Sequence, residues 1–282
     1  MIGIIGGTGL YQLEGLSEIQ SHSVDTPFGS PSSKVVVGRI GGTSVAFLAR
    51  HGIHHKILPT EINYRANIWA LKTLGVRQIV SVSAVGSLQA EIKPGDLAMA
   101  SQYIDFTKGK RNHTFFGEGI VAHISTARPS CPTLSHWIDQ SARTVDTLVH
   151  KDKTYVCVEG PRLGTRAESE YLRICKADVV GMTNVPEVFL AREAQLCYCT
   201  LAVATDYDCW HEDPNMHVSV DQIMALYKQN LGRVQTLIKE LVKQQPSGKQ
   251  DCSCHHALEN AVVSPDNDLP PDKRKMLAFL KS

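Results

Sequence analysis

The sequence predicts one α/β domain, in which short apolar strands alternate with helices around a central sheet. Three observations indicate this class. Apolar runs such as 2–5 and 197–205 stop abruptly at glycine or acidic residues, as buried strands do. Stretches with helical periodicity, such as 61–74, separate these runs. The chain has 282 residues, of which 43% are hydrophobic and 20% charged, which is ordinary for one sheet with a sizeable core.

Charge and hydropathy exclude several classes of partner. The net charge of +1 gives no electrostatic reason to expect a nucleic acid or a membrane as partner. No apolar run approaches the length that spans a bilayer. The chain enters an apolar strand at Ile2 without a basic leader, so we expect a cytoplasmic protein.

The first predicted strand, 2–5, runs into the glycine turn Gly6-Gly7-Thr8-Gly9. Such a turn can bring backbone N–H groups close to an anion, although it can equally be a tight connection. The spacing does not fit G-x-G-x-x-G, and no Gly-Lys-Ser/Thr follows. A dinucleotide oxidoreductase and a P-loop enzyme are therefore disfavoured.

The next predicted strands, 34–38 and 44–49, are joined by Gly41-Gly42, which indicates a hairpin. The second strand ends at Arg50-His51-Gly52. Arginine suits two-point recognition of an oxyanion, and histidine can add a donor near neutral pH. Beside the glycine turn, this strand end is a candidate second wall of a phosphate site.

A helix is predicted over 61–74, with Gly75 after its end. The strand 76–83 then leads into a small-residue turn, Ser83-Ala84-Val85-Gly86-Ser87, and strand 97–104 follows. The polar, glycine-bearing loop 105–123 is a candidate lid or subunit contact. The remaining predicted elements are strands 154–159 and 197–205, a short apolar run over 177–182, and helices 133–148, 168–176, 187–195 and 217–244.

Asp206 and Asp208 directly follow the most apolar strand, 197–205. The carboxyl ends of strands are where α/β proteins place ligands. Turn capping is the alternative role for such aspartates.

Several stretches taken together resemble the trimeric purine nucleoside phosphorylases, and within them the branch that cleaves 5′-methylthioadenosine. The matching stretches run in order from residue 2 to about residue 240, which is more specific than any one motif. They are 3–9, 50–52, 63–67, 83–87, 159–162, 181–183 with 186–187, and 204–208.

The resemblance implies a mixed central β-sheet, partly barrel-like, flanked by helices, in a homo-oligomer that is a trimer or a dimer of trimers. It implies phosphorolysis of 5′-methylthioadenosine to adenine and 5-methylthioribose-1-phosphate. Inorganic phosphate is then a co-substrate, and no cofactor is expected.

The resemblance also assigns roles to residues. Asp206 would protonate N7 of the leaving adenine, and Asp208 would accept from its exocyclic amino group. Met182 would lie under the ribose, and His123 would reach a neighbouring subunit's site. The implied phosphate ligands are Thr8, Arg50, His51, Ser83, Ala84 and Thr183. The implied walls of the apolar 5′ pocket are Val218 and Val220.

The chain departs from the family pattern at Leu163 and Gly164, where these enzymes commonly carry Phe and Ser. Both residues are expected at the base, where the departure removes an aromatic stack and a hydroxyl. A rival function is phosphorolysis of 6-oxopurine nucleosides or methylthioinosine, but those enzymes tend to carry Asn at the position of Asp206. A non-catalytic nucleotide-binding protein explains the glycine turns but not Asp206.

The catalytic domain is expected over 1–245, with a partly flexible tail over 246–282. Cys252 and Cys254 lie in this polar tail and are expected to add little to core packing. A bond between them would be strained. Cys-x-Cys with two adjacent histidines falls short of a four-ligand zinc site, so no metal is expected. The cysteines expected as small core residues are Cys157, Cys175, Cys197, Cys199 and Cys209.

Overall fold

A computed structural model of the chain describes residues 1–7, 10, 15–213, 220–245, 251–265 and 268–282. Its strands are β1 (Ile2–Gly6), β2 (Ser17–His22), β3 (Val35–Ile40), β4 (Thr43–Ala49), β5 (Gln78–Ser87), β6 (Leu97–Phe106), β7 (Val149–Val158), β8 (Val179–Gly181) and β9 (Cys197–Asp206). Its helices are α1 (Tyr64–Thr73), α2 (Pro132–Thr144), α3 (Arg166–Ile174), α4 (Asn184–Glu193), α5 (Val220–Lys243), the short 3-10 helix η2 (Ser253–His256) and α6 (Pro271–Lys281).

Among the described residues, nine strands form one mixed sheet in the order β2-β3-β4-β1-β5-β8-β7-β6-β9. The last strand also pairs with β5, so β5, β8, β7, β6 and β9 close on themselves. The predicted mixed, partly barrel-like sheet flanked by helices is confirmed. Closure removes the free edges of these five strands and brings β5 and β9 together along their whole length.

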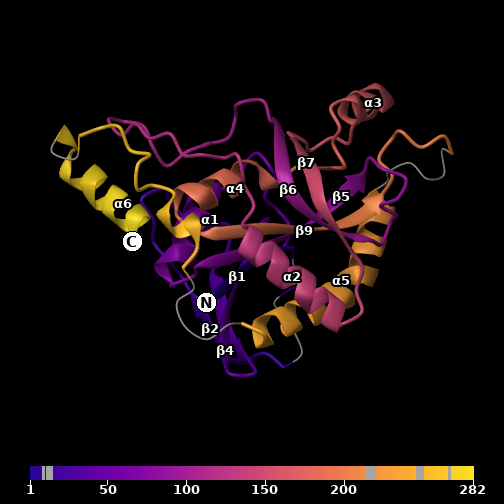
Figure 1. The fold of residues 1–282 in the computed structure, drawn as a ribbon, viewed down its shortest axis with the longest axis horizontal. Coiled ribbons are helices and arrows are strands. Elements are labelled where there is room, and N and C mark those ends of the chain that lie inside the picture. Colours follow the sequence, from indigo (N-terminus) through magenta and orange to yellow (C-terminus); the bar gives the residue numbers. More distant parts are fainter. Residues whose placement is uncertain (8–9, 11–14, 214–219, 246–250, 266–267) are drawn as a thin grey trace.

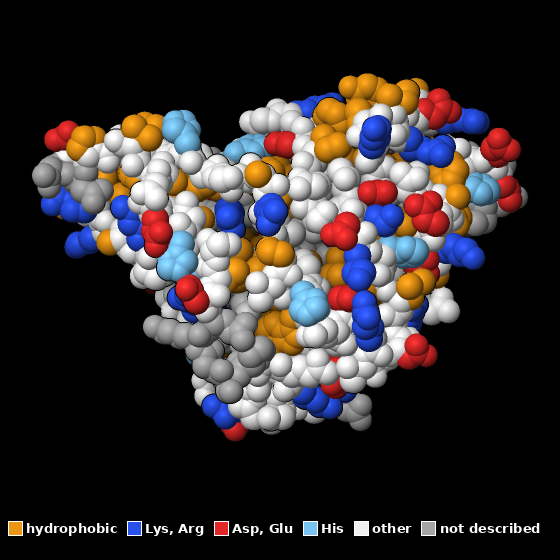
Figure 2. Space-filling model, in the orientation of Figure 1, with side chains coloured by type: hydrophobic (Ala, Val, Ile, Leu, Met, Phe, Trp, Pro, Cys, Tyr) orange, Lys and Arg blue, Asp and Glu red, His pale blue; other side chains and the backbone are white. Residues whose placement is uncertain are grey.

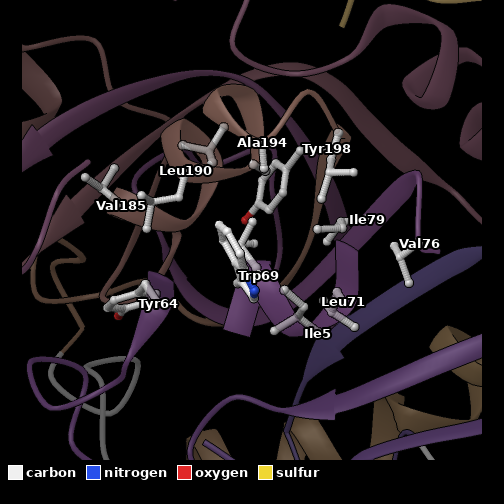
Figure 3. Packing of buried hydrophobic residues seen from close by; sticks show 14 of the residues in the cluster. Ile5, Tyr64, Trp69, Leu71, Val76, Ile79, Val185, Leu190, Ala194 and Tyr198 are labelled. Atoms are coloured by element: carbon white, nitrogen blue, oxygen red, sulfur yellow. The ribbon is translucent and has the colours of Figure 1, made fainter. Parts of the chain in front are cut away.

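Helices cover both faces of the sheet (Figure 1). Helices α1 and α4 pack together on one face and α2 and α5 on the other. The core beneath α1 and α4 is built around the ring of Trp69, with Leu190 and Tyr198 close by (Figure 3). Because β9 is buried along its entire length between these layers, any polar side chain at its end is held in a dry environment.

Local side-chain contacts explain where several helices begin. The Asn63 side chain accepts from the Ala66 N–H and caps α1. Thr165 and Glu168 form a capping box that starts α3. Helix α2 starts unusually, because the Cys131 thiol is its N-cap and accepts from the Leu134 N–H.

The structure corrects the sequence-based elements at three places. Strand β7 begins at Val149, five residues before the predicted strand 154–159, and α2 ends at Thr144 rather than at residue 148. Residues 83–87 are not a turn but the second half of β5, which continues to Ser87 because β9 pairs with it in parallel up to Gly86. Strand β2 was not predicted. Its sequence, SEIQSH, lacks an apolar alternation because this edge strand is exposed along nearly all its length.

The expectation that Cys252 and Cys254 add little to core packing is wrong, because both are buried in a core cluster, and other described residues of the tail are buried too. Leu258, Leu269 and Leu280 are buried in the same core cluster as residues of α1 and α4. Lys72 of α1 donates to the carbonyl oxygen of Ser282. The tail packs here because α6 presents an apolar face, and Phe279 lies against Trp69 with ring centroids 4.1 Å apart. The boundary at residue 245 stays a prediction.

The surface carries both signs of charge. In Figure 2, Lys, Arg, Asp and Glu side chains are interspersed over the visible face rather than gathered by sign. No helix in the described part of the chain is long and apolar enough to cross a membrane.

Candidate active site

A cavity of about 690 Å³ lies over the barrel, at the carboxyl ends of β5 and β9. Each described residue that the sequence placed at the substrate, except His123 and Val220, lines this one cavity. These residues are Arg50, His51, Ser83, Ala84, Leu163, Gly164, Met182, Thr183, Asp206 and Asp208.

Four predicted site residues are not placed at the cavity. Thr8 and Val218 lie outside the described residues, and so does the side chain of Val220, the first residue of α5. His123 is exposed, and its backbone N–H donates to the Ala261 carbonyl at 2.8 Å. It does not line the cavity of its own chain.

Strand register orders the cavity into levels. Gly86 of β5 is opposite Asp206 in β9 and opposite Val180 in β8. Thr183 follows the end of β8 by two residues, as the N-cap of α4, and it lines the same cavity as Ser83 of β5. Three residues of strand separate Ser83 from Gly86, which is about 10 Å. The cavity therefore has a hydroxyl end and a carboxylate end, with space for one sugar ring between them.

The hydroxyl end carries two buried oxygens that need a partner. The side-chain oxygens of Ser83 and Thr183 are shielded from solvent and have no hydrogen-bond partner among the described residues. Both residues line the cavity. A buried hydroxyl without a partner is costly, so a ligand that accepts two hydrogen bonds is expected between them.

Arg50 lies beneath this end, only 2% exposed, in a buried polar network. Its Nε and Nη2 donate to the two carboxylate oxygens of Glu187 at 2.8 and 2.9 Å, and Nη1 donates to the Val82 carbonyl. Burial alone would lower the pKa of Arg50, but Glu187 raises it, so the guanidinium stays charged. The group that Arg50 binds through two hydrogen bonds is thus the Glu187 carboxylate. A contact between Arg50 and phosphate stays a prediction.

His51 is held in one tautomer. Its Nδ1 lies 2.8 Å from the Ile57 carbonyl oxygen, so Nδ1 carries the proton and donates. Burial, together with the nearby charge of Arg50, lowers the pKa of His51 to about 4. The ring is therefore neutral near pH 7 and presents Nε2 as an acceptor. The sequence expectation of a donor here needs correction: His51 can accept from a protonated phosphate oxygen.

The carboxylate end is centred on Asp206, which is 4% exposed. Its Oδ2 accepts from the Thr205 hydroxyl at 2.7 Å, and its Oδ1 accepts from the Asp208 N–H at 2.8 Å. Burial raises the pKa of Asp206 to about 6, against these hydrogen bonds, and the charge of Asp208 adds to the rise. Asp206 is therefore a carboxyl group that can carry a proton near neutral pH.

Asp208 and Gly164 face each other at the same end. A Cβ added to Gly164 would lie 3.9 Å from both carboxylate oxygens of Asp208, which is ordinary contact. The space that a serine side chain would occupy at position 164 thus adjoins Asp208. Leu163 also lines the cavity, so the side chain at this position is aliphatic rather than aromatic.

Several lining residues were missed by sequence reasoning. Ile223, Met224 and Tyr227 of α5 form one wall of the cavity. Their spacing is that of one helix face, which was the available signal. Lys108 and Glu159 also line it, and they come from a loop and a strand end that only the fold brings together.

The raised pKa of Asp206 predicts a pH-dependent stability. A carboxyl group whose pKa is higher in the folded state stabilises the fold below its unfolded pKa, near 3.8, and loses that contribution as pH rises through about 6. The unfolding free energy of Asp206→Asn minus that of the parent should therefore increase by about 2.4 kcal/mol between pH 4 and pH 8, where the unfolded carboxyl is already more than half ionised at the lower pH. Urea denaturation at both pH values measures it. An unchanged difference would contradict the raised pKa.

Comparison with known proteins places these residues in a family context. Residues 1–243 match the family model described as the phosphorylase superfamily. The S-methyl-5′-thioadenosine phosphorylase of Geobacter sulfurreducens is 47% identical over 99% of this chain and 97% of its own length. The enzyme of the same name from Hyperthermus butylicus is 49% identical over 93% and 95%.

Solved structures agree with this comparison. A methylthioadenosine phosphorylase from an antarctic soil metagenomic library has a TM-score of 0.93 and 46% identity, covering 99% of this chain and 98% of its own. A variant adenosine/methylthioadenosine phosphorylase from Schistosoma mansoni, in complex with methylthioadenosine, has a TM-score of 0.80 and 36% identity, covering 88% and 92%.

Proposed function

The chain belongs to the phosphorylase superfamily, and we propose that it converts 5′-methylthioadenosine and phosphate to adenine and 5-methylthioribose-1-phosphate. The observation that carries this function is the buried carboxyl group of Asp206, with its raised pKa, in one cavity with two hydroxyls that have no partner among the described residues. One end suits a leaving base that needs a proton, and the other suits an anion. Relatives with the same named activity cover nearly the whole chain.

The hydroxyl end positions the nucleophile. Ser83 and Thr183 would donate to phosphate oxygens, the neutral His51 would accept from its protonated oxygen, and the Ala84 backbone would border it. Thr8 is proposed to complete this set. Holding phosphate at this level places an oxygen against the sugar carbon, which removes much of the entropic cost of bringing the reactants together.

The reaction exchanges one bond for another at the sugar. A phosphate oxygen forms a bond to C1′ as the bond from C1′ to N9 of adenine breaks, and the electron pair moves into the base. Asp206 donates its proton to N7, so that neutral adenine leaves, and it takes a proton from solvent before the next cycle. Proton donation of this type contributes roughly 10²- to 10⁴-fold in rate.

Base choice follows from the two aspartates. Asp208 is proposed to accept from the 6-amino group of adenine. A 6-oxopurine presents an acceptor at that position and would meet the carboxylate with repulsion, which disfavours methylthioinosine and other 6-oxopurine nucleosides. Gly164 and Leu163 are proposed to border the base, and Gly164 leaves space beside Asp208.

The sugar end of the nucleoside fits the remaining wall. Met182 lines the cavity between Gly181 and Thr183, and the ribose is proposed to lie against its side chain. The described residues Ile223 and Met224 of α5 give the cavity an apolar side, suited to a methylthio group. Val218 and Val220 are proposed to extend this side.

The activity is tested by following adenine release from 5′-methylthioadenosine with and without inorganic phosphate. We expect release that depends on phosphate and forms 5-methylthioribose-1-phosphate in equal amount. Methylthioinosine in place of the substrate should give far slower turnover. Equal release without phosphate would indicate hydrolysis, and faster turnover of methylthioinosine would favour the 6-oxopurine alternative.

Thr183→Ala should weaken phosphate binding more than nucleoside binding. A hydrogen bond to a charged group is worth about 1.5–3 kcal/mol, so KM for phosphate should rise roughly 10- to 150-fold. Steady-state kinetics with each substrate varied in turn measure it. Thr183→Ser keeps the hydroxyl and is the matched control. A rise confined to KM for the nucleoside would place Thr183 away from the anion.

We also propose that the chain acts as a homotrimer in the cytoplasm, with His123 completing the site of a neighbouring subunit. The exposure of His123 away from its own cavity supports a site shared between subunits. The eight cysteines, which form no disulfide, support the cytoplasm.

Co-expression of His123→Ala chains with Asp206→Ala chains tests the shared site. Each variant alone should be impaired, whereas mixed trimers contain sites with both residues intact and should recover activity. Light scattering should give three chains per particle. A monomer, or recovery absent from proven mixed trimers, would remove His123 from the site.

A further inference from the structure

Four cysteines from distant parts of the chain meet on the face of the sheet covered by α2 and α5. Cys131 is the N-cap of α2, Cys197 is the first residue of β9, and Cys252 and Cys254 come from the tail. Their sulfur atoms all lie within 4.8 Å of one another, and that of Cys131 is 3.6 Å from that of Cys252. All four are buried and free of disulfides. None lines the substrate cavity.

We propose that this cysteine cluster, Cys131, Cys197, Cys252 and Cys254, is a structural zinc site. Four thiolates around one zinc ion at about 2.3 Å place sulfurs about 3.8 Å apart in a tetrahedron, which the observed sulfur contacts approach. All four positions are filled by protein ligands, as in structural rather than catalytic zinc sites. The sequence expectation of no metal rested on two cysteines. The fold supplies the other two.

The surroundings of the cluster suit negatively charged sulfur. The Leu134 N–H donates to the Cys131 sulfur at 3.4 Å, and the start of α2 adds the positive end of a helix dipole. The Nε2 of His255 lies 3.6 Å from the Cys197 sulfur and can donate to it. Such outer contacts orient ligands and offset the charge that four thiolates bring to one divalent ion.

Zinc suits these ligands better than other ions do. Thiolates select zinc, copper(I) or iron over the hard cations, and a four-sulfur tetrahedron around a single ion is typical of zinc. Binding forms four Zn–S bonds and releases up to four thiol protons to solvent, with no oxidation or reduction. The ion would fasten the tail to α2 and β9, far from the chemistry.

The experiment is metal analysis of the full chain, expressed with zinc in the medium and purified under reductant. We expect about one zinc per chain in the parent and less than a tenth of that in the double variant Cys252→Ser/Cys254→Ser. Cys175→Ser is the matched control, because Cys175 lies at the end of α3 outside the cluster, and it should keep the parent's zinc. The melting temperature should fall in the double variant alone.

A second measurement on the parent does not depend on the variant folding. Cobalt(II) exchanged into the site should give the intense visible absorption of a tetrahedral tetrathiolate. A strong zinc chelator should keep the displaced zinc from rebinding to the four cysteines. Zinc retained by a folded double variant would place the ion elsewhere. A parent that binds neither zinc nor cobalt, with its four thiols free or paired as disulfides, would overturn the proposal.

Discussion

Asp206→Ala is expected to lower kcat on 5′-methylthioadenosine by roughly 10²- to 10⁴-fold, the range that general acid catalysis contributes. The variant removes the proton that Asp206 is proposed to give to N7, while the proposed anion site at Ser83 and Thr183 stays intact. KM for phosphate should therefore change little. Circular dichroism should be unchanged, because the carboxyl group is held by Thr205 and Asp208 without supporting the core.

A substrate that needs no proton separates catalysis from structure. In a nucleoside methylated at N7, the base already carries the positive charge that Asp206 would supply. Asp206→Ala should cleave this substrate at nearly the rate of the parent. A variant that is slow with both substrates would show that Asp206 positions the nucleoside, and one that is fast with both would remove it from the mechanism.

Glu187→Ala is expected to have the largest effect on stability. Glu187 is fully buried and accepts from Arg50, from the Ser81 hydroxyl and from the Tyr198 hydroxyl. Removing it leaves the Arg50 guanidinium charged and buried without its partner, which costs about 3–5 kcal/mol. Urea denaturation should show this as a lower midpoint with an unchanged slope.

An exposed pair serves as the control. Arg166 and Glu170 form an ion pair one turn apart on α3, with side chains 60% and 54% exposed. Glu170→Ala should cost no more than about 0.5 kcal/mol, because water already solvates both charges. Equal losses of unfolding free energy in Glu187→Ala and Glu170→Ala would mean that burial of the ion pair does not determine the cost of removing one partner. The same pairing predicts that Arg50→Ala destabilises the fold as well as perturbing phosphate binding.

The sequence predicted the fold where local pattern and burial agree. The strands that lead to Asp206 and to Arg50 were identified because each is an almost wholly apolar run that stops at a charge. Strand β2 lacked any such pattern. The half of β5 beyond Ser83 looked like a turn because small residues serve both turns and tightly closed barrels, and only pairing with β9 distinguishes the two.

The candidate site was predictable as a set of residues but not as a set of contacts. Arg50 was named from the sequence, yet its partner Glu187 lies 137 positions away and nothing local connects them. The tautomer of His51 depends on the Ile57 carbonyl, which no side-chain pattern encodes. Cys252 similarly meets Cys131 across 121 positions. Contacts of this range follow from topology, and the resemblance supplied topology only as far as residue 240.

Burial of the tail in the core has a consequence for the order in which the chain is made. Ile5 and Leu280 belong to one apolar cluster, so that cluster is assembled from segments that are synthesised far apart in time. While Leu258, Leu269 and Leu280 are still within the ribosome, the faces of α1 and α4 that they cover remain exposed to solvent. Apolar surface exposed in this way favours aggregation. Newly made chains are thus vulnerable until α6 has emerged and packed, although almost all of the proposed site residues are already made by then.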